Sequence, residues 1–364
     1  MDKKKNDPNK NNSTLITHGG TNLPSVTIDG YNLELKDKEG FIGDRASKSA
    51  FQDKLDDWRK RIRKGGEDPL GDIATKDLSK KQIDAVLTGK DKEAAALVMG
   101  AVEDFSGEIA HVLGKFLKED SWKGTERVVV GGGLKESGFG ELAIARAMVL
   151  LKAEGFKIEL TPIVHHPDEA GLIGAAHLMP AWMIGGYDAI LAVDIGGTNI
   201  RAGVVEMDLK NKPDLSKAAV WKFDLWRHAD DAPSRSATVE RLAAMLETLI
   251  AKAEKAKLTL APVIGIACPG IINPDGSIKR GGQNLPGGNW ESDTFNLGEA
   301  LVKAIPSIGA HDTVVIIHND AVVQGLSQIP FMQDVDKWGV ITIGTGLGNA
   351  RFTNKTPKKK SDKN

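Results

Sequence analysis

The stretch ILAVDIGGTNIRAGVVE, residues 190–206, joins two apolar strands through a tight glycine turn. An acidic side chain, Asp194, closes the first strand, and an ordinary β-hairpin needs no acid there. Glycines after a strand allow backbone N–H groups to approach an anion, because no side chain is in the way. Thr198 and Arg201 add two more donors, while Asp194 suits Mg²⁺ or its waters, through which it would meet a phosphate. The stretch therefore predicts phosphate binding, and the alternative is a plain hairpin turn.

Two other strands also run into glycine-rich turns. TIGTGLGNA, residues 342–350, has strand, turn and strand with Thr345 in the middle, and VVVGGGL, residues 128–134, ends in three glycines. One such turn arises easily by chance, but three together indicate several contacts to a phosphate or a nucleotide.

The segment IIHND, residues 316–320, is a buried strand that delivers Asn319 and Asp320 to its carboxyl end. Open α/β sheets bind their ligands at that end. Asp320 is suited to accept a proton from a hydroxyl that attacks a γ-phosphorus, and Asn319 to orient that alcohol. The alternative, equally open from the sequence, is that the pair caps a helix beginning at Ala321.

A long loop, residues 267–290, is rich in proline and glycine and ends in NLPGGNW. Loops of this length inside compact domains are often binding loops. Asn284 and Asn289 are candidates to bond sugar hydroxyls, and Trp290 offers a stacking face. The alternative is a stiffened surface excursion.

The bulk composition excludes several classes of protein. The 364 residues carry a net charge of −1, so no global basic field invites nucleic acid. One cysteine, Cys268, excludes an internal disulfide bond. No apolar run approaches the ~20 residues that span a bilayer, and the N-terminal MDKKKNDPNKNNS lacks the apolar core of a secretory signal. We therefore expect a cytoplasmic protein with neither membrane nor nucleic-acid partners.

Strands alternate with helices along the chain, which indicates layered α/β architecture. The helices are expected at residues 46–64, 79–119, 138–154, 168–179, 235–256, 296–305 and 321–328. Polar tails at residues 1–13 and 355–364 are expected to be disordered.

Five of these segments together carry a family resemblance. DIGGTNIRAGVVE, GIACPGIINPDG, NLPGGNW, HND and TIGTGLG resemble the ROK-type sugar kinases of the hexokinase–actin ATPase superfamily. The resemblance implies an α/β chain with a two-lobed, ribonuclease-H-like fold. The hairpin TIGTGLGNARF, with no zinc segment after it, is most similar to glucokinases that use polyphosphate or ATP.

The resemblance also implies roles for particular residues. Asp320 would be the general base, and Asp194 would hold Mg²⁺ through water. ATP would be the donor and a hexose, in the first place the 6-OH of glucose, the acceptor. The implied phosphate contacts are Gly196, Gly197, Thr198, Arg201, Gly344, Thr345 and Gly346; the implied adenosine contacts are Gly132 and Gly133; the implied sugar contacts are Gly270, Asn284, Asn319, Asp320 and Asn22.

The order of the motifs is reversed with respect to that family. The segments ERVVVGGGL and HHPDEAGLIGAAHL resemble the family's C-terminal end, yet they precede DIGGT in this chain. We therefore predict a circular permutation, which chain ends on a protein surface tolerate. The expected parts are a larger nucleotide-side lobe at 14–180, a smaller lobe at 187–325, and a phosphate hairpin at 326–354 that returns to the larger lobe.

Two departures from the family pattern matter. With Cys268 alone, the chain cannot build the cysteine-rich zinc site that many members carry, so no zinc is expected. The family's Glu-x-Gly-His sugar segment matches TNLPSVTIDG, residues 21–30, which places Asn22 and Ser25 where an acid and a histidine are usual. This departure weakens the expectation of glucose more than that of phosphoryl transfer.

Other functions remain open at this point. A sugar- or nucleotide-binding regulatory protein of the same fold would explain the altered sugar segment, although it would not need the base Asp320. Polyphosphate as donor would be favoured by cations near the cleft such as Lys279 and Arg280, and another hexose could be the acceptor. A homodimer is also left open.

Overall fold

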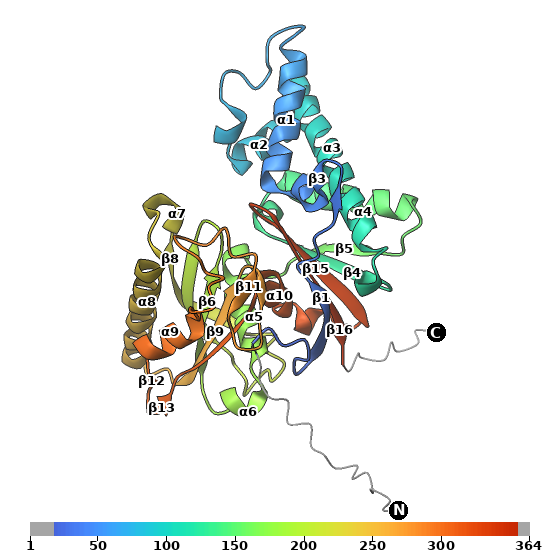
Figure 1. Cartoon of the computed structure of the whole chain (residues 1–364). Helices are drawn as coiled ribbons and strands as arrows, with labels where there is room; N and C mark the ends of the chain where they lie inside the picture. The colour runs from blue at the N-terminus through green and yellow to red at the C-terminus, as the bar shows by residue number, and fades with distance from the viewer. Residues whose placement is uncertain (1–17, 356–364) are drawn as a thin grey trace, which may run out of the picture.

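The second half of the chain builds a five-stranded sheet in the order β14-β9-β6-β7-β8 (Figure 1). The computed structural model describes residues 18–355. The strands are β6 (Ala189–Ile195), β7 (Ile200–Glu206), β8 (Ala219–Trp226), β9 (Leu260–Cys268) and β14 (Val314–Asn319). The first three are antiparallel, while β9 and β14 continue the sheet in parallel with β6.

Helices cover both faces of this sheet. Every residue of β6 is buried, as its apolar sequence requires of a strand covered on two sides. One face packs on α8 (Arg235–Lys255) and α9 (Leu297–Ala304), and the other on α5 (Pro167–Ala175). We call this sheet with these helices the small lobe.

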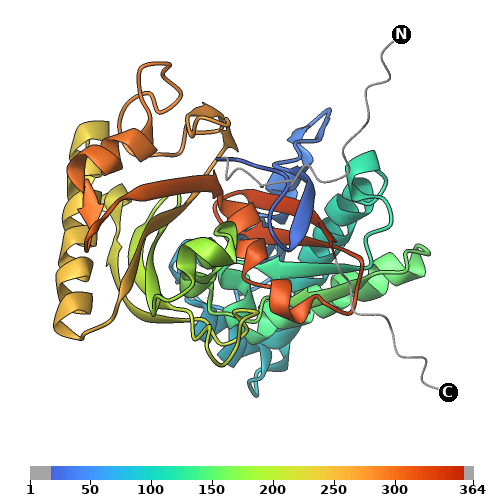
Figure 2. The same cartoon turned by 90° about the horizontal axis from the view of Figure 1, so that it is seen from below.

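The second five-stranded sheet has the order β1-β16-β15-β4-β5. Its strands are β1 (Val26–Tyr31), β4 (Arg127–Gly131), β5 (Glu159–Pro162), β15 (Lys337–Ile343) and β16 (Leu347–Asn354). One face packs on α3 (Lys92–Phe116) and α4 (Gly138–Ala153), over which α1 (Lys48–Ile62) and α2 (Lys80–Leu87) lie. The other face packs on α10 (Asp320–Leu326). We call this the large lobe; Figure 2 shows the two lobes side by side.

The two sheets share one topology. In each, a hairpin pairs with a third antiparallel strand on one side and with two parallel strands on the other. In the small lobe these five strands follow chain order. In the large lobe the same order appears when the strands are taken from β15 and β16 and then from β1, β4 and β5. The described ends of this sheet meet, since the Lys355 N–H donates to the Ser25 carbonyl at 3.1 Å. Together the lobes form the two-lobed, ribonuclease-H-like arrangement.

Two short helices, α5 and α10, lie between the two sheets and pack on each other. Gly174 of α5 lies so close to α10 that an added Cβ would come within 1.7 Å of the Val323 carbonyl oxygen. The predicted boundaries assigned residues 168–180 to the larger lobe and 321–325 to the smaller one. In the structure α5 packs on β6, β7 and β9 of the small lobe, whereas α10 packs on β15 and β16 of the large lobe and also contacts β9 and β14. Both helices are apolar enough to be buried between the two sheets. The sequence on either side of each helix therefore did not reveal which sheet the helix packs on.

The helices otherwise lie where the periodicity predicted them, with one exception. The expected helix at 79–119 is divided into α2 and α3. Asp91 accepts hydrogen bonds from the Glu93 and Ala94 N–H groups, both at 3.0 Å, and this N-cap starts a new helix. In the described part of the chain, no helix has the length and apolarity that crossing a membrane requires. The smaller elements are β2 (Lys36–Asp37), β3 (Gly40–Phe41), β10 (Ile271–Ile272), β11 (Ile278–Arg280), β12 (Ser307–Ile308), β13 (His311–Asp312), α6 (Ala181–Ile184) and α7 (His228–Asp231).

Candidate active site

A cleft of about 490 Å³ lies between the lobes and receives residues from both. All three glycine turns that the sequence singled out open into it, together with the strand end at Asp320. The lining includes Asp194, Gly196, Gly197, Thr198, Arg201, Gly270, Asn284, Asp320, Gly132, Gly133, Gly344, Thr345 and Gly346. Of the site residues that the resemblance implies, Asn319 and Asn22 lie outside this lining.

Asp320 stands at the start of α10, directly after β14, so strand and helix both fix its position. One carboxylate oxygen accepts a hydrogen bond from the Ala321 N–H at 2.9 Å. Burial, and then the negative charge of Asp194, raise the pKa of Asp320 to about 6. A carboxylate with this pKa is largely ionised at neutral pH and yet basic enough to take a proton from an alcohol in a transition state.

The Asn319 side chain bonds the backbone around Asp320 and does not line the cleft. Its side-chain oxygen accepts from the Ala321 and Val322 N–H groups at 3.0 and 3.2 Å, and its amide donates to the Gly270 carbonyl at 3.0 Å. The side chain is 2% exposed. Asn319 therefore caps α10 and ties the Gly270 loop to its start, while a contact of Asn319 with the sugar stays a prediction.

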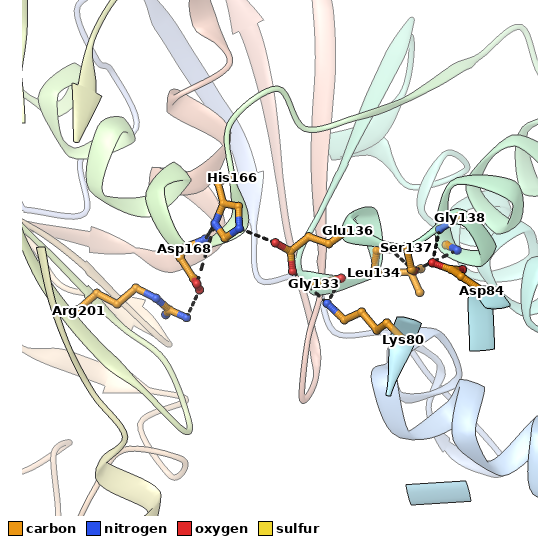
Figure 3. A network of polar contacts seen from close by, with 11 residues as sticks. Lys80, Asp84, Gly133, Leu134, Glu136, Ser137, Gly138, His166, Asp168 and Arg201 are labelled. Carbon is orange, nitrogen blue, oxygen red and sulfur yellow. Dashed lines mark hydrogen bonds and ion pairs between the residues drawn. The ribbon is translucent and has the colours of Figure 1, made fainter. Parts of the chain in front are cut away.

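Asp194 is held in the cleft by an arginine that is itself shared. Asp194 and Arg201 are opposite each other in the β6–β7 hairpin, with Arg201 Nη1 at 3.4 Å from Asp194 Oδ2. Arg201 Nη2 bonds the carboxylate of Asp168, a residue near the start of α5 (Figure 3). Burial raises the pKa of Asp194, and the charge of Arg201 opposes that rise. Arg201 is thus occupied by two carboxylates, and only its buried Nε has no partner in the described chain.

The carboxylates of the cleft fit a divalent cation. Asp168, Asp194 and Asp320 all line it, and Arg201 neutralises only part of their charge. Gly171 gives α5 room beside this group, because an added Cβ would lie 2.7 Å from Asp194 Cγ. Within residues 18–355, no group of three or more His, Cys, Asp or Glu side chains forms an all-protein metal site. One or two of the cleft carboxylates could hold Mg²⁺, which protein sites usually bind through such carboxylates plus water and phosphate oxygens.

The glycines of the two hairpin turns are not required by the backbone. An added Cβ at Gly346 would meet no atom within 4 Å, and one at Gly344 would come no nearer than 3.8 Å to any. Gly196 and Gly197 would each tolerate a Cβ at 3.4 Å. None of the four has a positive φ. A side chain at any of these four positions would enter the cleft. The glycines therefore leave room for a ligand that approaches the backbone.

Gly132 differs from those glycines. Its φ is +88°, and an added Cβ would lie 2.2 Å from the Ile343 carbonyl oxygen. This glycine lets β4 turn against the end of β15. It thereby sets the wall of the cleft on which the expected nucleoside side of the site lies.

The sugar side of the site is partly corrected. Asn22 is exposed and forms an isolated bridge with Thr27, so it does not reach the cleft, and Ser25 lines a different hollow. Trp290 is 2% exposed, donates from Nε1 to the Pro286 carbonyl at 2.9 Å, and packs edge-on against Phe295. The indole therefore offers no free stacking face. Asn289 lines a separate hollow of about 860 Å³ beside the start of α8.

Sequence reasoning missed several residues that line the cleft. Asn32 and Glu34 enter it because the buried Asn349 clamps Leu33 between them, accepting from the Leu33 N–H at 2.9 Å and donating to its carbonyl at 3.1 Å. Lys80 and Glu136 also line it, from α2 and from the turn after β4. No motif identified these four, since long-range packing brings them in. Asp168 had a signal in its segment DEAG, which follows two histidines and precedes a small-residue helix.

Comparison with known proteins gives one family match. Residues 190–359 match the ROK family, and no curated protein matches the chain. Among solved structures, a candidate N-acetylmannosamine kinase from Listeria monocytogenes is 26% identical with a TM-score of 0.32, covering 48% of this chain and 50% of its own. A candidate sugar kinase from Cytophaga hutchinsonii is 18% identical with a TM-score of 0.31, covering 46% and 48%. The Aquifex aeolicus PPX-GPPA enzyme is 16% identical with a TM-score of 0.23, covering 42% and 48%. The chain thus spans about half the length of each.

Proposed function

We propose that this chain, which carries ROK family sequence over residues 190–359, is a sugar kinase that transfers the γ-phosphoryl group of ATP to the 6-OH of a hexose, with glucose as the first candidate. The observation that carries the proposal is the placement of Asp320. A carboxylate with a pKa raised to about 6 faces the same cleft as two glycine turns that leave the backbone open to a phosphate chain. A phosphoryl transfer to an alcohol needs both parts.

The residues of the cleft divide the work between them. Asp320 accepts the proton of the attacking hydroxyl, and Asn319 caps the start of the helix on which Asp320 lies. The backbone N–H groups of the turns at 196–198 and 344–346 bind phosphate oxygens. Asp194 would hold Mg²⁺, which supplies charge neutralisation for the phosphates when bound. Because the two turns belong to different lobes, closure of the lobes would bring them together and exclude water.

The charge of the cleft favours ATP over inorganic polyphosphate. Among the described lining residues, only Lys80 and Arg201 are cationic, against the acids Glu34, Glu136, Asp168, Asp194 and Asp320. A long polyanion without a nucleoside needs a cationic track, which this lining does not supply. Lys279 and Arg280 are exposed and lie outside the lining. A magnesium nucleotide, whose cation offsets the acids, suits the site better.

We place the acceptor sugar near Asp320, Gly270 and Asn284. Gly270 has a φ of +99°, and an added Cβ would lie 2.4 Å from the Arg280 carbonyl oxygen, so the loop requires glycine there. Asn284 lies beside Gly197, since an added Cβ at Gly197 would come within 3.4 Å of the Asn284 Cβ. Its side chain lines the cleft, where it could bond sugar hydroxyls. With Asn22 outside the cleft, Asn32 and Glu34 are the polar side chains that its segment contributes.

We also infer that the chain order is a circular permutation. The shared topology of the two sheets and the contact of Lys355 with Ser25 support it, since the strands of the large lobe take the small-lobe order only across the chain ends. The nucleotide wall at Gly132 and the hairpin at Asp194 then belong to one kinase unit.

A coupled assay of ADP formation tests the function. The full chain is given MgATP, or polyphosphate, with a panel of hexoses, and the Asp320→Asn variant is run beside it. We expect one or more hexoses to stimulate turnover with ATP and the variant to lose it. If no sugar stimulates turnover, or if the variant equals the parent, the kinase proposal fails. Sugar binding without turnover would then favour the regulatory binder.

A further inference from the structure

Helix α2 is fixed above the cleft by contacts that the sequence did not signal. Asp84 of α2 accepts hydrogen bonds from the Gly138 and Phe139 N–H groups, at 2.9 and 2.8 Å. These groups belong to the first turn of α4, where a helix leaves its N–H donors unpaired. Ser79 and Gln82 form a capping box at the start of α2 itself. The first turn of α2 is therefore held next to the turn that follows β4.

This anchoring carries the ammonium group of Lys80 to the Gly132–Gly133 wall. Lys80 Nζ donates to the Gly133 carbonyl and lies 3.0 Å from Glu136 Oε2 (Figure 3). An ammonium group has three N–H donors, and these contacts use two of them. The Lys80 side chain is 40% exposed and lines the cleft. One N–H donor of the ammonium group thus remains for a ligand.

A chain of polar contacts connects Lys80 with the β6–β7 hairpin on the opposite side of the cleft. The second oxygen of Glu136 lies 2.5 Å from His166 Nε2, and His166 Nδ1 accepts from the Asp168 N–H at 3.1 Å. Asp168 in turn pairs with Arg201 (Figure 3). Both carboxylate oxygens of Glu136 are therefore occupied. Glu136 positions Lys80 and has no oxygen left for the ligand.

We infer that Lys80 is a donor-contacting residue, whose ammonium group binds an anionic phosphate oxygen of a nucleoside di- or triphosphate lying along the Gly132–Gly133 wall. The inference rests on the proposed function for its choice of ligand and specifies the donor class further. Lys80 and Arg201 are the only cations in the described cleft lining, and Arg201 is held by two carboxylates. The unpartnered Nε of Arg201 is buried, whereas the Lys80 side chain is 40% exposed, so Lys80 is the cation that can reach a phosphate in the cleft.

Equilibrium binding to the full chain tests this assignment. The affinities for MgADP and for adenosine are measured by calorimetry and by ligand-observed NMR in the parent, Lys80→Met, Lys80→Arg and Lys81→Met. Lys81 is the matched control, because it is the next residue on the same helix, is exposed and lies outside the lining. We expect Lys80→Met to weaken MgADP binding about tenfold or more, as loss of a charged hydrogen bond does. Adenosine binding should stay unchanged, Lys81→Met should equal the parent, and Lys80→Arg should recover part of the loss.

Two readouts separate a phosphate contact from mere support of the wall. If Lys80 only holds the Gly133 carbonyl, Lys80→Met weakens adenosine and MgADP alike. If Lys80 binds phosphate, the variant also shows a smaller dependence of MgADP affinity on ionic strength. Equal MgADP affinity in Lys80→Met and parent, equal loss for both ligands, or no MgADP binding by the parent would each overturn the inference.

These outcomes are distinct from failure of the proposed function. Lys80-dependent MgADP binding in a chain that phosphorylates no hexose would refute only the kinase activity. Hexose phosphorylation with an unchanged MgADP affinity in Lys80→Met would refute only the role of Lys80.

Discussion

The two lobes contain sheets of the same topology, but their strands come in a different order along the chain. In the small lobe, β6, β7, β8, β9 and β14 follow one another, whereas the large lobe takes its hairpin from the end of the chain and its other strands from the beginning. The cleft uses corresponding parts of both, a glycine turn from each hairpin. The comparison teaches that the site depends on how the strands pair and not on their order in sequence.

The lobes also differ in what each contributes. The small lobe supplies the acids, Asp194 and Asp320, at the ends of β6 and β14. The large lobe supplies the Gly132 wall, the turn at 344–346 and Lys80. In the proposed kinase each lobe gives one phosphate-binding turn, the small lobe also holds the base and the large lobe the nucleoside wall, so substitutions at Asp320 and at Gly132 should have separable effects.

The largest effect is expected from Asp320→Asn on the small-lobe side. Removal of a general base should lower kcat by about 10³-fold while the KM for the donor changes little. The α10 cap should persist, because Asn319 provides it. Steady-state kinetics with the exposed Asp312→Asn as control provides the measurement. A donor KM that rises as steeply as kcat falls would mean that Asp320 takes part in binding the donor instead of acting as a base.

Glycine substitutions compare two turns of the large lobe. Gly346→Ala should leave the melting temperature unchanged and weaken kcat/KM for ATP about 10–100-fold, because the new methyl enters only the cleft. Gly132→Ala should lower the free energy of unfolding by about 1–3 kcal/mol, because its φ of +88° disfavours a side chain and the Cβ meets a carbonyl oxygen. Thermal unfolding and kinetics of both variants decide the matter. Destabilisation by Gly346→Ala would show that its turn has a structural need for glycine.

The pKa of Asp320 gives a pH dependence with a definite sign. Activity should rise with pH through about 6 and then level off, as the base loses its proton. The contribution of Asp320 to the free energy of unfolding should fall as the pH rises. The folded chain holds this proton more tightly than the unfolded chain, so the contribution of Asp320 is present at low pH and lost as pH rises through about 6. Asp320→Asn should therefore melt higher than the parent at pH 8 and not at pH 4. The same melting difference at both pH values would contradict a raised pKa.

The smallest effect is expected from reordering the chain. A chain that runs from residue 187 to 364 and then from 1 to 186 joins the large-lobe strands and opens the chain at α6, where Trp182 is 74% exposed. Its melting temperature should stay within about 5 °C of the parent's, and it should bind MgADP equally well. A reordered chain that fails to bind MgADP would show that the present order is needed to form the cleft.

Features that depend on local sequence could be predicted, and those that depend on distant packing could not. The β6–β7 hairpin and the strand end at Asp320 follow from short apolar runs next to turn residues. Asn22 lies outside the cleft because it precedes β1, and the register of β1 against β16 brings the opposite end of that strand toward the cleft. The predicted stacking face of Trp290 is not available to a ligand, because Phe295 packs against the indole ring. Lys80 gave no signal, since contacts with residues far along the chain position its helix, among them those of Asp84 with the start of α4.

The central claim is tested most directly by following the phosphorus atoms. The full chain is incubated with MgATP and glucose, and then with the other hexoses, while ³¹P NMR records the products. The account predicts a sugar phosphate monoester that appears in step with ADP and is absent with Asp320→Asn. Spectra that show ATP unchanged, or inorganic phosphate without any sugar phosphate, for every hexose would contradict it.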